Sequence, residues 1–217
     1  MERKVAIIIG HREGNEGAVN YLGESEYSFN TRIAGKMEGL FHRVNAFAFS
    51  RERNESMSLL AEEIAEFNPA LSIELHFNSF SQPVKGAVTE ALIHHNSSIQ
   101  TLVLSKIFLQ EMQNEFKFGI RGALRVNQGD RGYINLNHLA VANSNIASIL
   151  VEPVFGNFET SEAVEFFSRE DDYVKVIVTT VNKFFKAMDK HGQARDFDRE
   201  RHINISKLST GCIRLEE

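Results

Sequence analysis

Residues 5–11, VAIIIGH, decide the fold, because an unbroken apolar run gives way at once to glycine and histidine. A short run of this kind predicts a strand that is buried on both faces, as in a parallel sheet. A second stretch, residues 72–79 (SIELHFNS), has the same plan and reaches a histidine at His76. In open α/β sheets, ligands bind beyond the carboxyl ends of the strands. Because each of these two strands ends at a histidine, we predict a ligand-binding site at the carboxyl edge of the sheet.

The rest of the chain alternates apolar strands with amphipathic helices. Strands are predicted at 4–9, 43–49, 70–76, 86–93, 120–126 and 146–152, and helices from residue 26, at 56–67, at 98–116 and within 160–188. Such alternation predicts a three-layer α/β fold, with a central, mostly parallel, twisted sheet flanked by helices. Residues 127–143 are predicted to be a loop, which either lines a substrate site or simply connects two strands.

A single catalytic domain is predicted over residues 1–188, followed by a short polar C-terminal tail over 189–217. The tail is too short to form an independent domain with a core of its own. The sequence predicts no oligomeric state.

The composition excludes several classes of protein. A net charge of −5 and a pI of about 5.9 argue against nucleic acid as a partner. The single cysteine, Cys212, rules out a disulfide within the chain and a cysteine-rich metal site. The first apolar run is too short for a signal peptide, and no window approaches a membrane span. We therefore expect a protein that is made in the cytoplasm.

His11 and His76 suit a catalytic zinc ion, which takes three protein ligands and keeps one open position. They lie 65 residues apart, so no local helical metal motif is involved. The third ligand is expected from the loop after the first strand, where Glu26 begins the first predicted helix and Glu24 is the alternative. Two further carboxylates in that loop are Glu13 and Glu16.

Two other glutamates lie in or after apolar strands. Glu152 ends the strand predicted at 146–152, directly after an apolar run, where a carboxylate is costly to bury unless it is paired. Beside a metal site, it could serve as general base and acid. Glu74 alternates with Ile73 and Leu75, which indicates a side chain directed to solvent or to a polar sheet edge. Each residue alone also has a purely structural interpretation.

Taken together, these motifs resemble the zinc-dependent N-acetylmuramoyl-L-alanine amidases that cleave peptidoglycan. The resemblance covers roughly residues 4–186. It is carried by IIIGHREGNEGAV (7–19), ESEYSFNTRIA (24–34), SIELHFNS (72–79), the Arg121-Gly122 pair and ILVEPVFGN (149–157). One departure is that Arg12 and Glu13 follow the first histidine, where the family often has glycines.

The resemblance implies that His11, Glu26 and His76 hold Zn²⁺ and that Glu152 is the catalytic carboxylate. The bond cut would be the amide between N-acetylmuramic acid and L-alanine in peptidoglycan, the expected partner. Substrate-binding residues are expected at Asn78, Arg51, Arg121 and Arg131. The enzyme would act on the cell wall after release, as a bacteriophage lysis enzyme does.

Two alternatives remain at this point. One is a zinc amidohydrolase acting on a small N-acyl or N-formyl amino acid, with an arginine binding its carboxylate. The other is an inactive α/β binding module, which would be expected to have lost its metal ligands.

Overall fold

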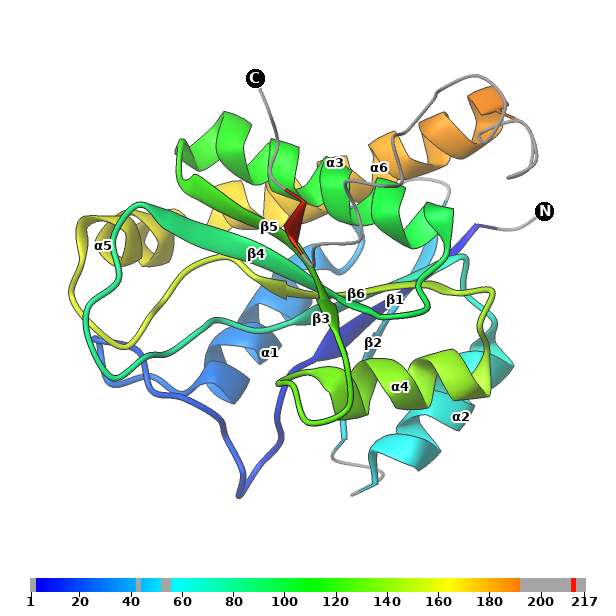
Figure 1. Cartoon of the computed structure of the whole chain (residues 1–217), viewed down its shortest axis with the longest axis horizontal. Helices are drawn as coiled ribbons and strands as arrows, with labels where there is room; N and C mark the ends of the chain where they lie inside the picture. Colours follow the sequence, from blue (N-terminus) through cyan, green and yellow to red (C-terminus); the bar gives the residue numbers. More distant parts are fainter. Residues whose placement is uncertain (1–2, 42–43, 52–55, 192–211, 214–217) are drawn as a thin grey trace.

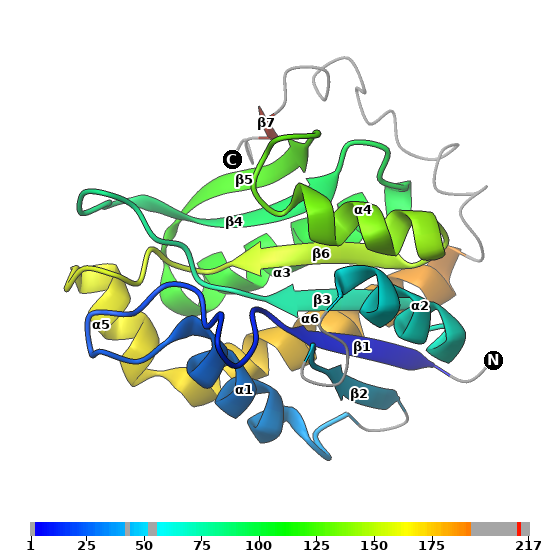
Figure 2. The ribbon, with the colours of Figure 1, turned by 90° about the horizontal axis from the view of Figure 1, so that it is seen from below.

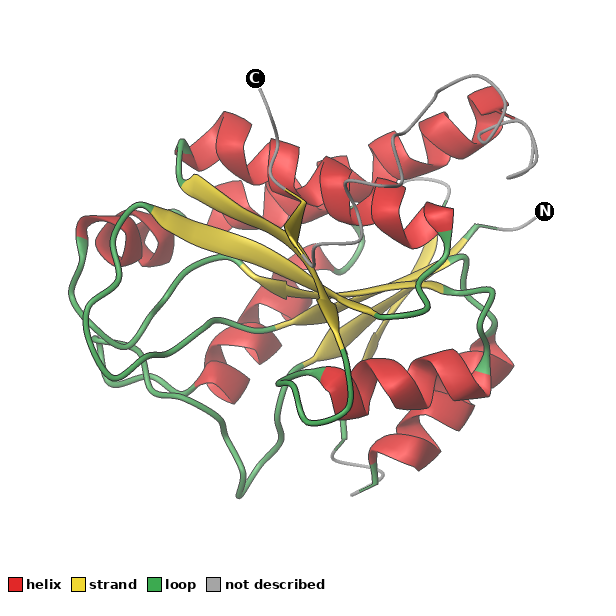
Figure 3. Cartoon of the chain, in the orientation of Figure 1, coloured by secondary structure: helices red, strands yellow, loops and turns green. Residues whose placement is uncertain are grey.

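The computed structural model describes residues 3–41, 44–51, 56–191 and 212–213, and within them the chain forms one twisted sheet between two layers of helices (Figure 1). The sheet has seven strands in the order β2-β1-β3-β6-β4-β5-β7. Figure 3 shows the helices on both sides of the strands. The predicted three-layer α/β fold is confirmed.

Four neighbouring strands of the sheet run parallel to one another, the next two run in the opposite direction, and the last strand runs in the direction of the first four. The parallel set is β2 (Asn45–Phe49), β1 (Lys4–Ile9), β3 (Leu71–Leu75) and β6 (Ala147–Glu152). Next come β4 (Ala87–His94), antiparallel to β6, then β5 (Gly119–Val126), parallel to β4, and β7 (Cys212–Ile213), antiparallel to β5. The carboxyl ends of β1, β3 and β6 therefore meet at one edge.

The helices divide between the two faces of the sheet. One face carries α1 (Glu26–Met37), α3 (Ile99–Phe116), α5 (Ser161–Ser168) and α6 (Glu170–His191). The other carries α2 (Met57–Phe67) and α4 (Tyr133–Ala142), which pack together (Figure 2). Strand β1 shows why both layers form: Val5, Ile7 and Ile9 join the larger core, and Ala6 and Ile8 join the smaller one.

Helix α4 was not predicted, because the sequence suggested a loop over 127–143. Apolar residues lie on several sides of the helix, of which only Leu136 and Leu139 are buried, and its first residue is preceded by Gly132 with no side-chain cap. Contacts with α2, β4 and β6 stabilise it, so the helix depends on packing that local sequence does not reveal.

Regular secondary structure continues beyond residue 188, the expected end of the catalytic domain. Helix α6 continues to His191, and β7 pairs with β5 through Ala123 and Leu124. The remainder of the predicted tail lies outside the described residues. Within the described part of the chain, no helix is long and apolar enough to span a membrane.

Candidate metal centre and active site

Three candidate residues lie where parallel strands end side by side. His11 follows β1, His76 directly follows β3, and Glu152 is the last residue of β6. The register places Ile9 opposite Leu75, and Leu75 opposite Val151, so the three strands end at nearly the same level. The backbone N–H of His76 also donates to Val151 O at 3.2 Å. The predicted convergence of the strand ends is confirmed.

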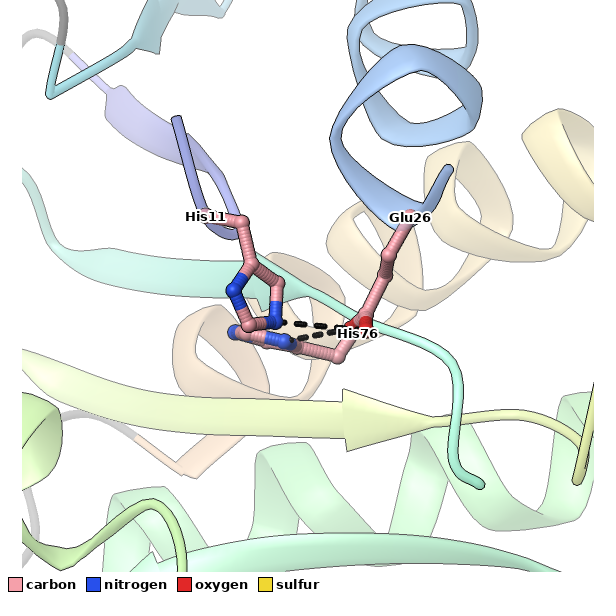
Figure 4. A group of neighbouring side chains, drawn as sticks. All are labelled: His11, Glu26 and His76. Atoms are coloured by element: carbon pink, nitrogen blue, oxygen red, sulfur yellow. Dashed lines mark hydrogen bonds and ion pairs between the residues drawn. The ribbon is translucent and has the colours of Figure 1, made fainter. Parts of the chain in front are cut away.

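His11, Glu26 and His76 form one compact cluster (Figure 4). Glu26 Oε1 lies 2.7 Å from His76 Nδ1, and Glu26 Oε2 lies 3.2 Å from His11 Nε2. One candidate ligand atom from each residue lies within 4.8 Å of the other two. Glu26 and His76 are buried, whereas the side chain of His11 is 27% exposed. The cluster is therefore open toward solvent at His11.

The start of α1 holds Glu26 in place. Ser25 caps the helix by accepting a hydrogen bond from Ser28 N–H at 3.2 Å, so Glu26 is fixed in its first turn. The backbone N–H of Phe77 donates to Glu26 Oε1, and that of Ala18 donates to Oε2. Both carboxylate oxygens thus have fixed positions between the two histidines.

Two glycines make room for this cluster. A Cβ atom on Gly17, whose φ is 80°, would lie 2.6 Å from His11 Nε2 and 2.8 Å from Glu26 Oε2. A Cβ atom on Gly10 would lie 2.6 Å from Cε1 of His76. Any other residue at these positions would push the ligands apart. The glycines that accompany the first histidine therefore have a steric function at the candidate metal centre.

The electrostatics of the cluster suit a bound cation. Burial alone would raise the pKa of Glu26, but hydrogen bonds with His11 and His76 outweigh it and lower this pKa to about 2. Burial would lower the pKa of His76, but hydrogen bonds with Glu26 and Glu74 raise it to about 10. Positive charge is thus favoured beside Glu26, and two imidazoles with one carboxylate are a donor set that zinc prefers.

Glu152 occupies a different environment within the same site. Burial raises its pKa to about 7, although the positive charges of His76 and Arg131 act in the opposite direction. Arg131 Nη1 donates to Glu152 Oε1 at 3.2 Å. The other carboxylate oxygen is buried and has no hydrogen-bond partner among the described residues. A carboxyl group with a pKa near neutrality is suited to both accepting and donating a proton.

A buried carboxylate, Glu90, lies beside Glu152 and was missed in the sequence. It lies within β4 opposite Glu152 and is fully buried. Asn78 Nδ2 donates to Glu90 Oε1 at 2.9 Å, Arg121 Nη1 lies 2.9 Å from Oε2, and Arg131 also pairs with Oε1. Glu90 thus contacts three of the four residues that are predicted to bind substrate. The available signal was a glutamate inside the apolar run at 87–93.

The remaining candidates lie elsewhere. Glu24 pairs with Arg32 and accepts a hydrogen bond from Ser28, outside the histidine cluster. Arg51 follows β2 and is half-buried, with no ion pair to another residue in the described ranges. The structure thus brings Glu26, not Glu24, between the histidines, and it does not join Arg51 to the rest of the site.

The expectation for Glu74 was wrong. Its side chain points neither to solvent nor to a polar edge, because β3 is covered on both faces and Glu74 is only 1% exposed. Its Oε1 atom lies 3.1 Å from His76 Nε2 and accepts a hydrogen bond from Asn135 Nδ2 at 2.5 Å. Asn135 lies 61 residues further along the chain, and the alternating pattern does not show that His76 turns back toward Glu74.

Comparison with known proteins gives one family. A family model described as N-acetylmuramoyl-L-alanine amidase matches residues 5–182. This range includes the histidine cluster, Glu152 and the candidate substrate-binding residues Arg51, Arg121 and Arg131. A search of curated proteins found no match to the sequence.

Several solved structures share the fold. An N-acetylmuramoyl-L-alanine amidase from Clostridium difficile 630 superposes with a TM-score of 0.67 and 16% identity, covering 85% of this chain and 97% of that one. AmiC2 of Nostoc punctiforme gives 0.65 and 18%, covering 86% and 98%. The catalytic domain of the CD27L endolysin, which targets Clostridium difficile, gives 0.63 and 23%, covering 83% and 97%. At these identities the likeness concerns the fold.

Proposed function

The chain belongs to the N-acetylmuramoyl-L-alanine amidase family, and we propose that His11, Glu26 and His76 hold the zinc ion with which it works. The family assignment confirms the resemblance seen in the sequence. The protein is accordingly an amidase that hydrolyses the bond between N-acetylmuramic acid and L-alanine in peptidoglycan. The observation that carries the proposed metal site is the convergence of two imidazole nitrogens on the buried carboxylate of Glu26.

We propose that Glu152 moves the proton in this reaction. A zinc ion with three protein ligands supplies Lewis acidity, which polarises a carbonyl group and acidifies water. The carboxylate of Glu152 accepts the proton of the attacking water and then delivers it to the nitrogen of the departing L-alanine. Its pKa of about 7 supports both transfers at neutral pH. Arg131, which donates to Glu152 Oε1, holds the carboxylate in place.

The arginines beside Glu90 are our candidates for binding polar groups of the stem peptide. The side chains of Arg121 and Arg131 are each 44% exposed while one edge of each guanidinium is paired with Glu90. This pairing restricts their motion, and restricted donors lose less entropy when they bind substrate. Asn78 is buried and contributes by holding Glu90. Arg51, which follows the carboxyl end of β2, is kept as a further candidate for binding substrate.

The catalytic domain is proposed to occupy residues 1–188, with residues 189–217 as an appendage to it. We further propose that the enzyme acts on the cell wall after release from the compartment where it is made. The inactive-module alternative is disfavoured because all three metal-binding candidates and Glu152 are present and close together.

The experiment that tests this function combines metal analysis with an assay. Zinc is quantified in the purified protein, and release of stem peptides with new N-terminal alanine is measured on purified peptidoglycan, with and without chelator. We expect about one zinc per chain, activity that chelation abolishes, and loss of both zinc and activity in His76→Ala. Zinc without peptidoglycan cleavage would favour the small-substrate amidohydrolase instead.

A further inference from the structure

We propose that Glu74 is a positioning residue for the metal centre, which accepts the Nε2 proton of His76 and so leaves Nδ1 free to bind the metal. The inference rests on the proposed metal site. It assigns a function to a buried carboxylate that the proposed reaction does not otherwise use.

The two ring nitrogens of His76 face two different carboxylates. Nδ1 lies 2.7 Å from Glu26, the residue that also contacts His11, and Nε2 lies 3.1 Å from Glu74 Oε1. The nitrogen directed at the candidate metal centre is therefore Nδ1. A neutral imidazole that binds metal through Nδ1 carries its proton on Nε2, and Glu74 is the acceptor at that position.

The carboxylate of Glu74 is rigidly held. It projects from β3, a central strand whose neighbours are β1 and β6, and it is 1% exposed. Asn135 Nδ2, from the first turn of α4, donates to the same oxygen that faces His76. Strand β3 and the side-chain amide of Asn135 together fix the position of Glu74 Oε1. The hydrogen bond to this oxygen in turn fixes the plane of the His76 ring.

Glu74 has no lysine or arginine partner among the described residues, and its Oε2 atom is buried without a hydrogen-bond partner there. A buried carboxylate is costly unless positive charge compensates it. The only basic side chain that is paired with Glu74 in this part of the chain is that of His76, one of the proposed metal ligands. The charge balance of Glu74 therefore depends on the metal centre, as expected of a carboxylate that supports a metal ligand.

The segment at the start of α4 joins this support to the catalytic carboxylate. Arg131, just before the helix, contacts Glu90 and Glu152, and Asn135 in its first turn contacts Glu74. One short segment thus fixes both the orientation of His76 and the position of Glu152. The start of α4 is thereby tied to residues at the carboxyl ends of both β3 and β6.

The test measures zinc affinity of the full chain by competition with a chelator, for wild type, Glu74→Ala, Glu74→Gln and Asn135→Ala. Loss of an outer partner of a metal-binding histidine typically weakens affinity 10- to 100-fold. We expect a loss in that range for Glu74→Ala and a smaller loss for Asn135→Ala. Glu74→Gln should recover most of the affinity, because its amide oxygen can still accept the Nε2 proton. Asn137→Ala is the matched control and should bind zinc like wild type. Asn137 lies in the same helix, but its side chain accepts a hydrogen bond from Tyr133.

The absorption spectrum of the Co²⁺-substituted protein provides a readout of ligand geometry that does not depend on activity. We expect Glu74→Ala to change this spectrum while its metal-free melting temperature stays close to that of Glu74→Gln. Wild-type affinity and an unchanged spectrum in Glu74→Ala would overturn the inference, provided that wild type binds zinc. Loss of turnover in Glu74→Gln with wild-type zinc affinity would also overturn it, since Glu74 would then act in the reaction. Failure of wild type to bind zinc would instead refute the proposed metal site.

Discussion

Glu26 and Glu152 are both buried glutamates at the same edge of the sheet, yet their surroundings move their pKa values in opposite directions. Glu26 lies between two histidines, and its pKa is lowered to about 2. Glu152 has one arginine partner and an oxygen without a hydrogen-bond partner in the described structure, and burial raises its pKa to about 7. Opposed shifts of neighbouring carboxyl groups separate a permanently charged group from one that exchanges a proton. The comparison teaches that the partners, not the residue type, assign the two functions.

The largest expected effect concerns turnover in Glu152→Gln. Glutamine fills the same space but cannot accept and return a proton, so we expect kcat on peptidoglycan to fall about 10²- to 10⁴-fold. The zinc content should remain at the wild-type level. Glu159→Gln, an exposed position in the following loop, is the control. A nearly normal kcat in Glu152→Gln would contradict the assignment of proton transfer to Glu152.

The same substitution should stabilise the metal-free protein at alkaline pH. The pKa of Glu152 is about 7 in the folded state and 4.5 for an ordinary glutamate, so folded chains keep a proton that unfolded chains release. Stability is therefore lost as the pH rises from about 4.5 to 7, by about 3 kcal/mol in all. Glu152→Gln removes this cost. Urea unfolding at pH 8 and pH 4 should show a gain in the free energy of unfolding at pH 8 that disappears at pH 4.

The pH dependence of kcat/KM tests whether Glu152 acts as the general base. Because Glu152 must be ionised to accept a proton, kcat/KM should fall about tenfold per pH unit below a midpoint near pH 7. The zinc content is measured at each pH, so that metal loss is distinguished from protonation of the base. A rate independent of pH between 5 and 7, with zinc fully bound, would contradict a titrating Glu152.

The smallest effect is expected at Arg131. Its positive charge lowers the pKa of Glu152, so Arg131→Ala should shift the acid limb of kcat/KM to higher pH and reduce activity a few-fold near neutrality. Arg131→Lys keeps the charge and should shift the limb less. An unchanged limb in Arg131→Ala would show that this ion pair does not tune the base.

The sequence was sufficient for the parts of the site that follow from strand ends. His11, His76 and Glu152 could be placed together because the carboxyl ends of parallel strands converge. The place of Glu26 at the start of a predicted helix favoured it over Glu24, and the family resemblance pointed to the same residue. Serine at position 25 is a capping residue, which agrees with a helix that begins at Glu26.

The sequence was insufficient where side chains depend on distant partners. Glu74 and Glu90 lie inside apolar strands, and alternation alone cannot distinguish an exposed glutamate from a buried one that is paired. Besides the nearby His76 and Asn78, their partners are Asn135, Arg121 and Arg131, which come from segments at least 30 residues further along the chain. The unpredicted helix α4 positions one of these partners directly.

The most direct test of the central claim is the zinc content of two isosteric variants, Glu26→Gln and Glu152→Gln, measured by elemental analysis after identical purification. If Glu26 binds the metal and Glu152 moves the proton, Glu152→Gln will hold about one zinc per chain and Glu26→Gln far less. Equal zinc content in the two variants would contradict the division of function between these glutamates.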